Sequence, residues 1–224
     1  MHIAKGCIDE IYLDGRRAAR LTCPPALVPA PGQYLLAHAA ADPASPLANP
    51  IFAAGICPGG FYAAPPLPDN WLPGTELTLR GPRGHGFSLP AAARFVALAA
   101  FGGTCARLLA LLEPALAQKA AVVLLTDDPP DGLPSAVEIS PLSALPETAS
   151  WADYLAIDIP RAAIPDIQKP AQQLSHIGYA QVLIETPIPC GGIGECSLCA
   201  VSLRKGYRLA CQDGPVFDLK AILG

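Results

Sequence analysis

The sequence lacks the features of a nucleic-acid-binding or a secreted protein. It contains no run of five Lys or Arg residues, only 15% of its 224 residues are charged, and its net charge is −4. Nucleic acid is therefore not an expected ligand, because its phosphates are bound mainly by clustered cations. The first residues, Met1 to Gly6, show no basic stretch followed by an apolar one, so no secretory signal is expected.

The sequence also lacks an uninterrupted apolar run long enough to cross a membrane. The longest apolar stretch, Phe95 to Leu112, is interrupted by Gly102, Gly103 and Arg107. A membrane-spanning helix needs about 18 or more consecutive apolar residues. We therefore expect a cytoplasmic protein without a membrane span, and the 51% of hydrophobic residues are sufficient for a substantial core.

Residues 1 to about 90 predict a small antiparallel β-barrel. Short β-like runs alternate there with turns rich in Pro and Gly, a pattern typical of barrels. The segment from Ala39 to Asn49 is expected to be a surface loop. The expected strands are Ile8–Leu13, Gln33–Ala37, Pro50–Ala54 and Glu76–Arg80.

Residues 91 to about 175 predict a small α/β domain. Phe95–Ala100 and Ala121–Leu125 are continuous apolar runs, as buried parallel strands are. Between them, Thr104–Lys119 is expected to form one helix with Thr104 as its N-cap and with a bend at Pro114. Further expected strands are Val137–Ile139, Tyr154–Ile157 and, after residue 176, Tyr179–Glu185.

The eight cysteines fall into two sets of four. In a cytoplasmic protein, cysteines indicate metal binding or reactivity more often than disulfides. One set is scattered among apolar residues and is interpreted as inert buried thiols: Cys7, Cys23, Cys57 and Cys105. The other set lies within 22 positions near the end of the chain in the pattern C-x5-C-x2-C-x11-C: Cys190, Cys196, Cys199 and Cys211.

This second set predicts a [2Fe–2S] cluster. An iron–sulfur cluster needs four thiolates around a compact core and N–H donors near its sulfides. Glycine adopts positive φ without steric cost, so Gly191, Gly192 and Gly194 allow the loop to wrap closely. Three cysteines in one loop and one distant cysteine is the arrangement of plant-type ferredoxins.

Zinc and a disulfide pair are the alternatives for these cysteines. Zinc sites usually combine two C-x2-C knuckles, whereas this sequence has one. The nearby histidine, His176, is not spaced as a ligand. A zinc-stabilised interaction module is therefore the minor hypothesis.

Two segments around the cysteines resemble the electron transfer subunit of class 1B dihydroorotate dehydrogenase. They are residues 189–200 (PCGGIGECSLCA) and 206–217 (GYRLACQDGPVF). Upstream, residues 31–34 resemble the P-G-Q-[FY] turn of that family's flavin-binding barrel. Residues 73–77 and 81–87 resemble its G-D-x-L-x-x-x-G-P-x-G-x-G-F segment.

The resemblance implies a β plus α/β, ferredoxin reductase-like fold of three domains. These are an FAD-binding-like β-barrel (1–90), an NAD-binding-like α/β domain (91–175) and a [2Fe–2S] cluster domain (176–224). The residues implied for FAD are Asn49, Pro50, Ile51, Phe52, Gly74 and Thr75, and those implied for NAD are Gly102 and Gly103.

The resemblance also implies a function. In such a subunit NADH reduces FAD, and the cluster exchanges single electrons with an FMN-containing dihydroorotate dehydrogenase catalytic subunit. The two subunits form a heterotetramer that acts in pyrimidine biosynthesis.

The flavin motif departs from the family pattern. Its phosphate-binding arginine is replaced by Ala48 or Asn49, and its ring-facing serine by Phe52. Loss of a guanidinium removes a charge-assisted phosphate contact.

The two segments that would bind NAD depart as well. The glycine-rich turn keeps Gly102 and Gly103, but the later glycine has become Cys105 or Ala106, where a Cβ hinders close approach to a pyrophosphate. The C-G-P-x-P-M segment is absent. Arg107 is either a phosphate-binding residue or a solvated charge at the start of a helix.

Two functions therefore remain open. The first is an electron transfer subunit that binds FAD, and the second is a cluster-only relay or scaffold that has lost FAD and NAD binding. Direct oxidation of NADH by this chain is not expected.

Overall fold

The computed structural model describes residues 2–12, 18–39, 47–168, 174 and 178–223. Most of the loop predicted between Ala39 and Asn49 lies outside the described residues, as do Leu13 and His176. Within the described residues, every helix is too short or too polar to span a membrane.

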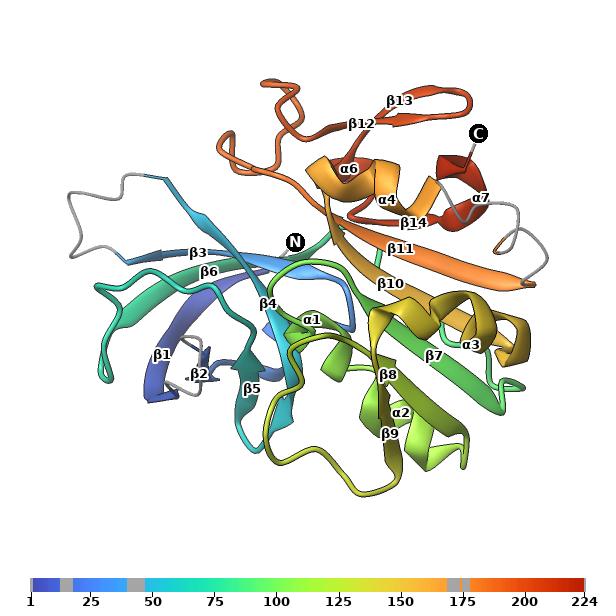
Figure 1. Ribbon diagram of the computed structural model, residues 1–224. Coiled ribbons are helices and arrows are strands. Elements are labelled where there is room, and N and C mark those ends of the chain that lie inside the picture. The colour runs from blue at the N-terminus through green and yellow to red at the C-terminus, as the bar shows by residue number, and fades with distance from the viewer. Residues whose placement is uncertain (1, 13–17, 40–46, 169–173, 175–177, 224) are drawn as a thin grey trace.

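The N-terminal part is a closed six-stranded antiparallel barrel, as predicted (Figure 1). Its strands follow one another around the barrel in the order β1-β2-β5-β4-β3-β6. Their bounds are β1 His2–Tyr12, β2 Ala18–Thr22, β3 Tyr34–Ala39, β4 Asn49–Cys57, β5 Gly60–Ala63 and β6 Glu76–Arg83. A short 3-10 helix, Pro25–Leu27, packs against β1 and β6.

The barrel forms because large apolar side chains point inward. Leu21, Phe61, Trp71 and Leu79 are almost fully buried in one cluster. The sequence did not predict β2 and β5, because each is short: the alternation in β2 covers only Ala19–Thr22, and β5 has none. They pair with each other and close the barrel between β1 and β4.

The second part is a six-stranded sheet with the order β14-β11-β10-β7-β8-β9. All neighbouring strands are parallel except β14, which is antiparallel to β11. The predicted strands are confirmed. Their bounds are β7 Phe95–Ala100, β8 Ala121–Leu125, β9 Val137–Ser140, β10 Tyr154–Pro160, β11 Tyr179–Glu185 and β14 Val216–Asp218.

The single helix predicted over Thr104–Lys119 is wrong. The structure has two short helices, α1 Ala106–Leu109 and α2 Leu112–Ala117. Pro114 has no N–H to donate to the carbonyl four residues before it, so a continuous helix would lack a hydrogen bond there. The N-cap is Cys105 rather than Thr104, whose Oγ1 accepts a hydrogen bond from the Ala106 N–H.

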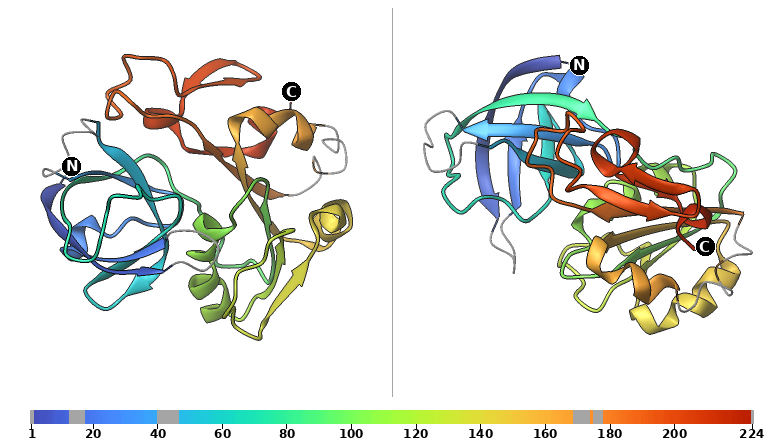
Figure 2. Two further views of the ribbon diagram at one scale, coloured as in Figure 1. Left: turned by 60° about the vertical axis from the view of Figure 1, so that its left-hand side comes forward. Right: turned by 90° about the horizontal axis from the view of Figure 1, so that it is seen from above.

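Helices cover both faces of this sheet (Figure 2). Alternate residues of each strand point to opposite faces, so Val96 and Leu98 pack towards α1 and α2 while Ala97 and Ala99 pack on the other side. That other side carries α3 Leu145–Trp151, α4 Ile164–Gln168 and α7 Leu219–Ile222, with 3-10 turns at Leu142–Ala144 and Arg161–Ala163.

The last part of the chain joins this sheet and also extends beyond it. Strands β11 and β14 are sheet members, whereas the cysteine loop, the hairpin β12 Ala200–Leu203 and β13 Gly206–Leu209, and α6 Ala210–Asp213 lie above the sheet edge (Figure 1). The predicted boundary at residue 176 therefore falls between two paired strands, β10 and β11. The three-domain division itself stays a prediction.

Candidate functional site

The four clustered cysteines come from three adjoining elements. Cys190 and Cys196 lie in the turn-rich loop after β11 and are half-buried, whereas Cys199 precedes β12 and is 1% exposed. Cys211 lies in α6 and is also 1% exposed. Two thiols therefore face the protein interior and two lie near solvent.

The thiols contact one another in two pairs, Cys190 with Cys196 and Cys199 with Cys211. Burial raises the pKa of Cys211 to about 12, and the Cys199 side chain and the nearby Cys190 add to this effect. Burial also acts to raise the pKa of Cys190. A side-chain hydrogen bond with Cys196 and backbone N–H groups outweigh it and lower that pKa to about 6.

The loop presents backbone N–H groups to these thiols. Those of Gly192, Gly194 and Cys196 lie beside the Cys190 sulfur, and that of Gly194 also serves Cys211. Gly192 and Gly194 have φ of +74° and +82°, which turn their N–H groups inward. Thiolates in two pairs with N–H donors around them fit a binuclear iron–sulfur core, in which each iron takes two protein ligands.

In the part of the chain that the structure describes, no three His, Cys, Asp or Glu side chains form a group spaced to hold one metal ion.

We expect Gly194→Ala to weaken retention of the cluster. An alanine at φ +82° is strained by about 1–3 kcal/mol, and its Cβ would lie 2.3 Å from Gln212 Nε2. The matched control is Gly206→Ala in the β12–β13 hairpin, with φ +91° and no atom near its Cβ. Iron release to a chelator should be faster for Gly194→Ala than for Gly206→Ala. Equal rates would contradict a role of the Gly194 backbone conformation in holding the cluster.

Side chains of the barrel strands β3 and β6 contact the cysteine loop and α6. Arg83 Nη2 donates to the Gly192 carbonyl at 2.5 Å, and Tyr34 Oη donates to the Cys211 carbonyl at 3.0 Å. The Arg80 side chain lies next to Gly191. Strands β3 and β6 thereby fix the loop to the barrel.

Tyr34→Phe should destabilise the protein by about 1–3 kcal/mol, because it leaves a buried carbonyl without its donor. Urea unfolding of the anaerobic, cluster-containing protein measures the effect. Tyr207→Phe is the control, since Tyr207 is 73% exposed, and its stability should change by less than about 0.5 kcal/mol. The same unfolding midpoint for both variants would exclude Tyr34 as an anchor.

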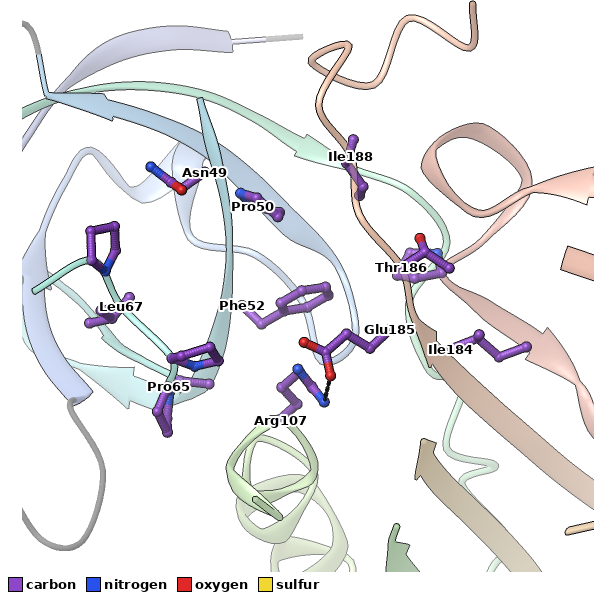
Figure 3. A pocket seen from close by; sticks show the side chains of 14 residues that line it. Asn49, Pro50, Phe52, Pro65, Leu67, Arg107, Ile184, Glu185, Thr186 and Ile188 are labelled. Carbon is purple, nitrogen blue, oxygen red and sulfur yellow. Dashed lines mark hydrogen bonds and ion pairs between the residues drawn. The ribbon is translucent and has the colours of Figure 1, made fainter. Parts of the chain in front are cut away.

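A cavity of about 430 Å³ lies between the barrel and the sheet (Figure 3). Phe52 projects into it from β4, and Glu185 and Arg107 face Phe52 from the sheet side. The Phe52 ring packs on the Tyr34 ring, with 5.9 Å between the ring centroids. The Arg107 guanidinium lies 5.7 Å from the centroid of the Phe52 ring. The lining residues are Asn49, Pro50, Phe52, Ala64, Pro65, Pro66, Leu67, Pro68, Arg107, Ile184, Glu185, Thr186, Ile188 and Pro215.

Arg107 is not a solvated charge, and that alternative is wrong. It is 4% exposed, and its Nε and Nη2 atoms bond both oxygens of Asp158 at 2.8 and 3.0 Å. Nη2 also bonds Glu185 Oε2 at 3.0 Å. Burial opposes its charge, but the two carboxylates raise the pKa of Arg107 and keep it protonated. Burial raises the pKa of Asp158, and the Arg107 charge works against that rise.

The cavity lining does not fit the diphosphate of FAD. Arg107 is the one cation among its lining residues, and two carboxylates already neutralise it. A diphosphate needs free cations or a set of backbone N–H groups. The lining also contains two uncharged polar side chains, Thr186 on the sheet side and Asn49 at the far end on the barrel (Figure 3).

The structure brings together only part of the predicted FAD set. Asn49, Pro50 and Phe52 line the cavity, but Ile51 is 1% exposed in the barrel core. Gly74 and Thr75 do not line it. They form the turn before β6, where the Gly74 N–H donates to the Ile8 carbonyl and Thr75 Oγ1 accepts from Leu72.

Of the predicted NAD set, Gly103 lines a second, smaller cavity of about 210 Å³ beside α1, whereas Gly102 does not. Gly102 has φ +103° and lies against Pro160. The lining of this cavity contains Asp128 and no Lys or Arg. It therefore offers no cationic side chain to the pyrophosphate of NAD.

Glu185 and Thr186 were not recognised from the sequence as cavity residues. The sequence did contain one signal for a buried ion pair near this cavity. Asp158 stands between two isoleucines in an apolar strand, and a buried carboxylate needs a cationic partner. That partner, Arg107, lies 51 positions away. The Thr186 side chain has no comparable signal.

Comparison with known proteins supports both the cysteine site and the fold. Residues 185–223 match the family described as the iron-sulfur cluster binding domain of dihydroorotate dehydrogenase B. No curated protein matches the chain.

Solved structures give the fold. The structure of an NADH-dependent reduced ferredoxin-NADP oxidoreductase, studied for flavin-based electron bifurcation, is similar with a TM-score of 0.73 and 14% identity, over 97% of this chain and 89% of that one. The ferredoxin reductase in carbazole 1,9a-dioxygenase has a TM-score of 0.59 and 19% identity, over 80% of this chain and 67% of that one. A ferredoxin NADP+ reductase from Neisseria gonorrhoeae, with bound FAD and NADP, is similar with a TM-score of 0.53 and 13% identity, over 82% of this chain and 98% of that one.

These findings define the class by its fold: a ferredoxin reductase-like fold whose C-terminal segment matches an iron–sulfur cluster binding domain. Within this class, the predicted resemblance to the electron transfer subunit of class 1B dihydroorotate dehydrogenase is confirmed.

Proposed function

We propose that this chain is the electron transfer subunit of a dihydroorotate dehydrogenase and works with an FMN-containing catalytic subunit in pyrimidine biosynthesis. Cys190, Cys196, Cys199 and Cys211 hold a [2Fe–2S] cluster, which when bound accepts and releases one electron at a time. The observation that carries the proposal is the pairing of these thiols inside a segment that matches the cluster domain of that enzyme.

The surface around the cysteine loop supports docking of a partner subunit. Ile193 and Leu198 lie beside the ligand cysteines and are 55% and 52% exposed, and Tyr207 in the neighbouring hairpin is 73% exposed. Exposed apolar side chains grouped around a functional site are typical of interaction surfaces. Docking there brings the partner next to Cys190 and Cys196, the two ligands nearest solvent, in a heterotetramer.

A cluster-only relay is the second candidate. It is favoured because the Arg107 guanidinium is already bonded to two carboxylates. With its guanidinium engaged by Asp158 and Glu185, the cavity offers no free cation for FAD. Such a protein exchanges electrons singly and has no acceptor for the hydride of NADH. FAD and NAD therefore remain predictions that the lining residues do not support.

Anaerobic purification followed by iron, sulfide and flavin analysis tests the proposal. We expect about two irons and two sulfides per chain. Dihydroorotate added together with the catalytic subunit should bleach the visible absorbance of the cluster, and dihydroorotate alone should not. A colourless protein that contains zinc would refute the proposal, and the flavin content separates the two candidates.

A further inference from the structure

Two arginines from different parts of the fold donate hydrogen bonds to the segment that carries the ligand cysteines. Arg83 is the last residue of β6 in the barrel, and its Nη2 donates to the Gly192 carbonyl at 2.5 Å. Arg161 follows β10 of the sheet, and its Nη1 donates to the carbonyls of Leu198 and Ala200 at 2.6 and 3.2 Å. The segment is therefore held from the barrel side and from the sheet side, each time by a cation.

Arg83 connects to residues of both thiol pairs. The residue that it bonds, Gly192, directs its N–H group towards the Cys190 sulfur. The Arg83 side chain also hydrogen-bonds the Tyr34 hydroxyl, which donates to the Cys211 carbonyl at 3.0 Å. In addition, Arg83 and Cys211 line one hollow of about 400 Å³. The guanidinium is thus fixed between the loop of the first pair and the helix of the second.

Arg161 reaches the same segment because of the sheet topology. Strands β10 and β11 are parallel neighbours, so the residues that follow them lie at the same edge of the sheet. Arg161 follows β10 directly, and the cysteine loop follows β11. The two residues whose carbonyls it bonds are the chain neighbours of Cys199 on either side. The charge of Arg161 is therefore placed next to this ligand.

Cations at these positions act on the charge of a bound [2Fe–2S] cluster. Two Fe(III), two sulfides and four thiolates sum to two negative charges, and uptake of one electron converts one Fe(III) to Fe(II) and adds a third. A cation stabilises the form with three negative charges more than the form with two. Cations beside the cysteines therefore favour the reduced form, which means that they raise the reduction potential.

Exposure decides how strongly each arginine acts. Arg83 is half-buried between the barrel and the cysteine loop, where solvent ions screen its charge little, whereas Arg161 is exposed. Between Cys190 and Cys199 the acidic residue of the sequence is Glu195, which is exposed as well. Solvent weakens the effect of both exposed groups, so the charge of Arg83 dominates.

We propose that Arg83, and to a smaller extent Arg161, raise the reduction potential of the cluster. Neither residue is a cluster ligand, and each acts through its charge at a position fixed by the carbonyl that it bonds. This inference rests on the proposed function, which supplies the cluster, and adds the residues that set its potential.

A reductive titration of the anaerobic, cluster-containing protein, followed by visible absorbance and electron paramagnetic resonance, tests the proposal. Arg83→Met keeps most of the side-chain length and removes the charge. The ratio of reduced to oxidised protein at a given potential should fall about tenfold, which is a drop of about 59 mV for one electron. Arg83→Lys keeps the charge and should recover most of this drop.

Arg161→Met gives an independent test, because an exposed residue can be replaced with little effect on the fold. At low salt the same ratio should fall about threefold, in keeping with the modest strength of exposed charge interactions. The difference from wild type should disappear in about 1 M salt, where the Debye length is only about 3 Å.

Arg94→Met is the matched control. Arg94 also donates to backbone carbonyls, those of Ala91 and Ala93 at 3.0 and 3.1 Å. It precedes β7, which is parallel to β10 and β11, and so lies at the opposite edge of the sheet from the cysteine loop. The potential of this variant should equal that of wild type.

Unchanged potentials in Arg83→Met and Arg161→Met would overturn the proposal. A drop in Arg83→Lys as large as in Arg83→Met would do so too, as would an equal drop in Arg94→Met. Iron analysis of the same samples separates the two levels of the argument. A wild-type protein without iron would refute the proposed function and this inference with it, whereas an intact cluster with an unchanged potential refutes only the inference.

Discussion

Cys196→Ser is expected to remove the iron–sulfur cluster. Serine has no thiolate, and the paired thiol of Cys190 would be left without the second ligand of its iron. Iron and sulfide content should fall to near zero, and the visible absorbance of the cluster should disappear. The loop would also lose the core around which Gly192 and Gly194 wrap, so it should become more susceptible to proteolysis.

Cys7→Ser is the matched control for this prediction. Cys7 lies in β1, where its thiol contacts the Ile8 carbonyl, and it does not contact the other set of cysteines. This variant should keep its full iron content. Full iron in Cys196→Ser would exclude Cys196 as a ligand, and iron loss in both variants would show that any cysteine replacement damages the protein.

Arg107→Met is expected to destabilise the protein by about 3–5 kcal/mol. The substitution keeps the length of the side chain but leaves the carboxylate of Asp158, which is 0% exposed, without a cation. An unpaired buried charge is far more costly than a missing ion pair. Urea unfolding measures the loss, and the double variant Arg107→Met/Asp158→Asn should recover most of it because no buried charge remains.

The loss in Arg107→Met should depend on pH. Burial raises the pKa of Asp158, and without Arg107 nothing opposes that rise. A folded-state pKa above the unfolded value means that the penalty is absent below about pH 4 and grows as pH rises towards the folded-state pKa. The variant should therefore lie closer to wild type at pH 5 than at pH 8. A loss independent of pH would show that packing, and not charge, is responsible.

Arg20→Met serves as the comparison for a half-buried arginine at the barrel surface. Arg20 lies 3.8 Å from Asp9 on the barrel surface, with a side chain 34% exposed. Both side chains of this pair are about one-third exposed, whereas Asp158 is 0% exposed, so this substitution should cost much less than Arg107→Met and show little pH dependence. Comparable losses would contradict the importance of burial at Arg107.

The sequence by itself determined the elements whose signals are local. Continuous apolar runs identified β7 and β8 with their observed bounds, because a strand buried on both faces needs no polar residue. The bounds of β11 were also predicted, although Gln181 interrupts its apolar residues. The spacing of four cysteines with three glycines identified the cluster segment for a similar reason, since most of its ligands come from one short loop. The family match over residues 185–223 agrees with that prediction.

Only the tertiary structure decided the features that depend on residues far apart in the chain. Closure of the barrel required β2 and β5, which are too short for their sequence pattern to identify them and are defined by pairing with neighbours. Arg107 became a buried ion-pair partner because β10 places Asp158 beside it, 51 positions later. Burial and charge compensation arise from packing between elements, so local sequence patterns do not contain them.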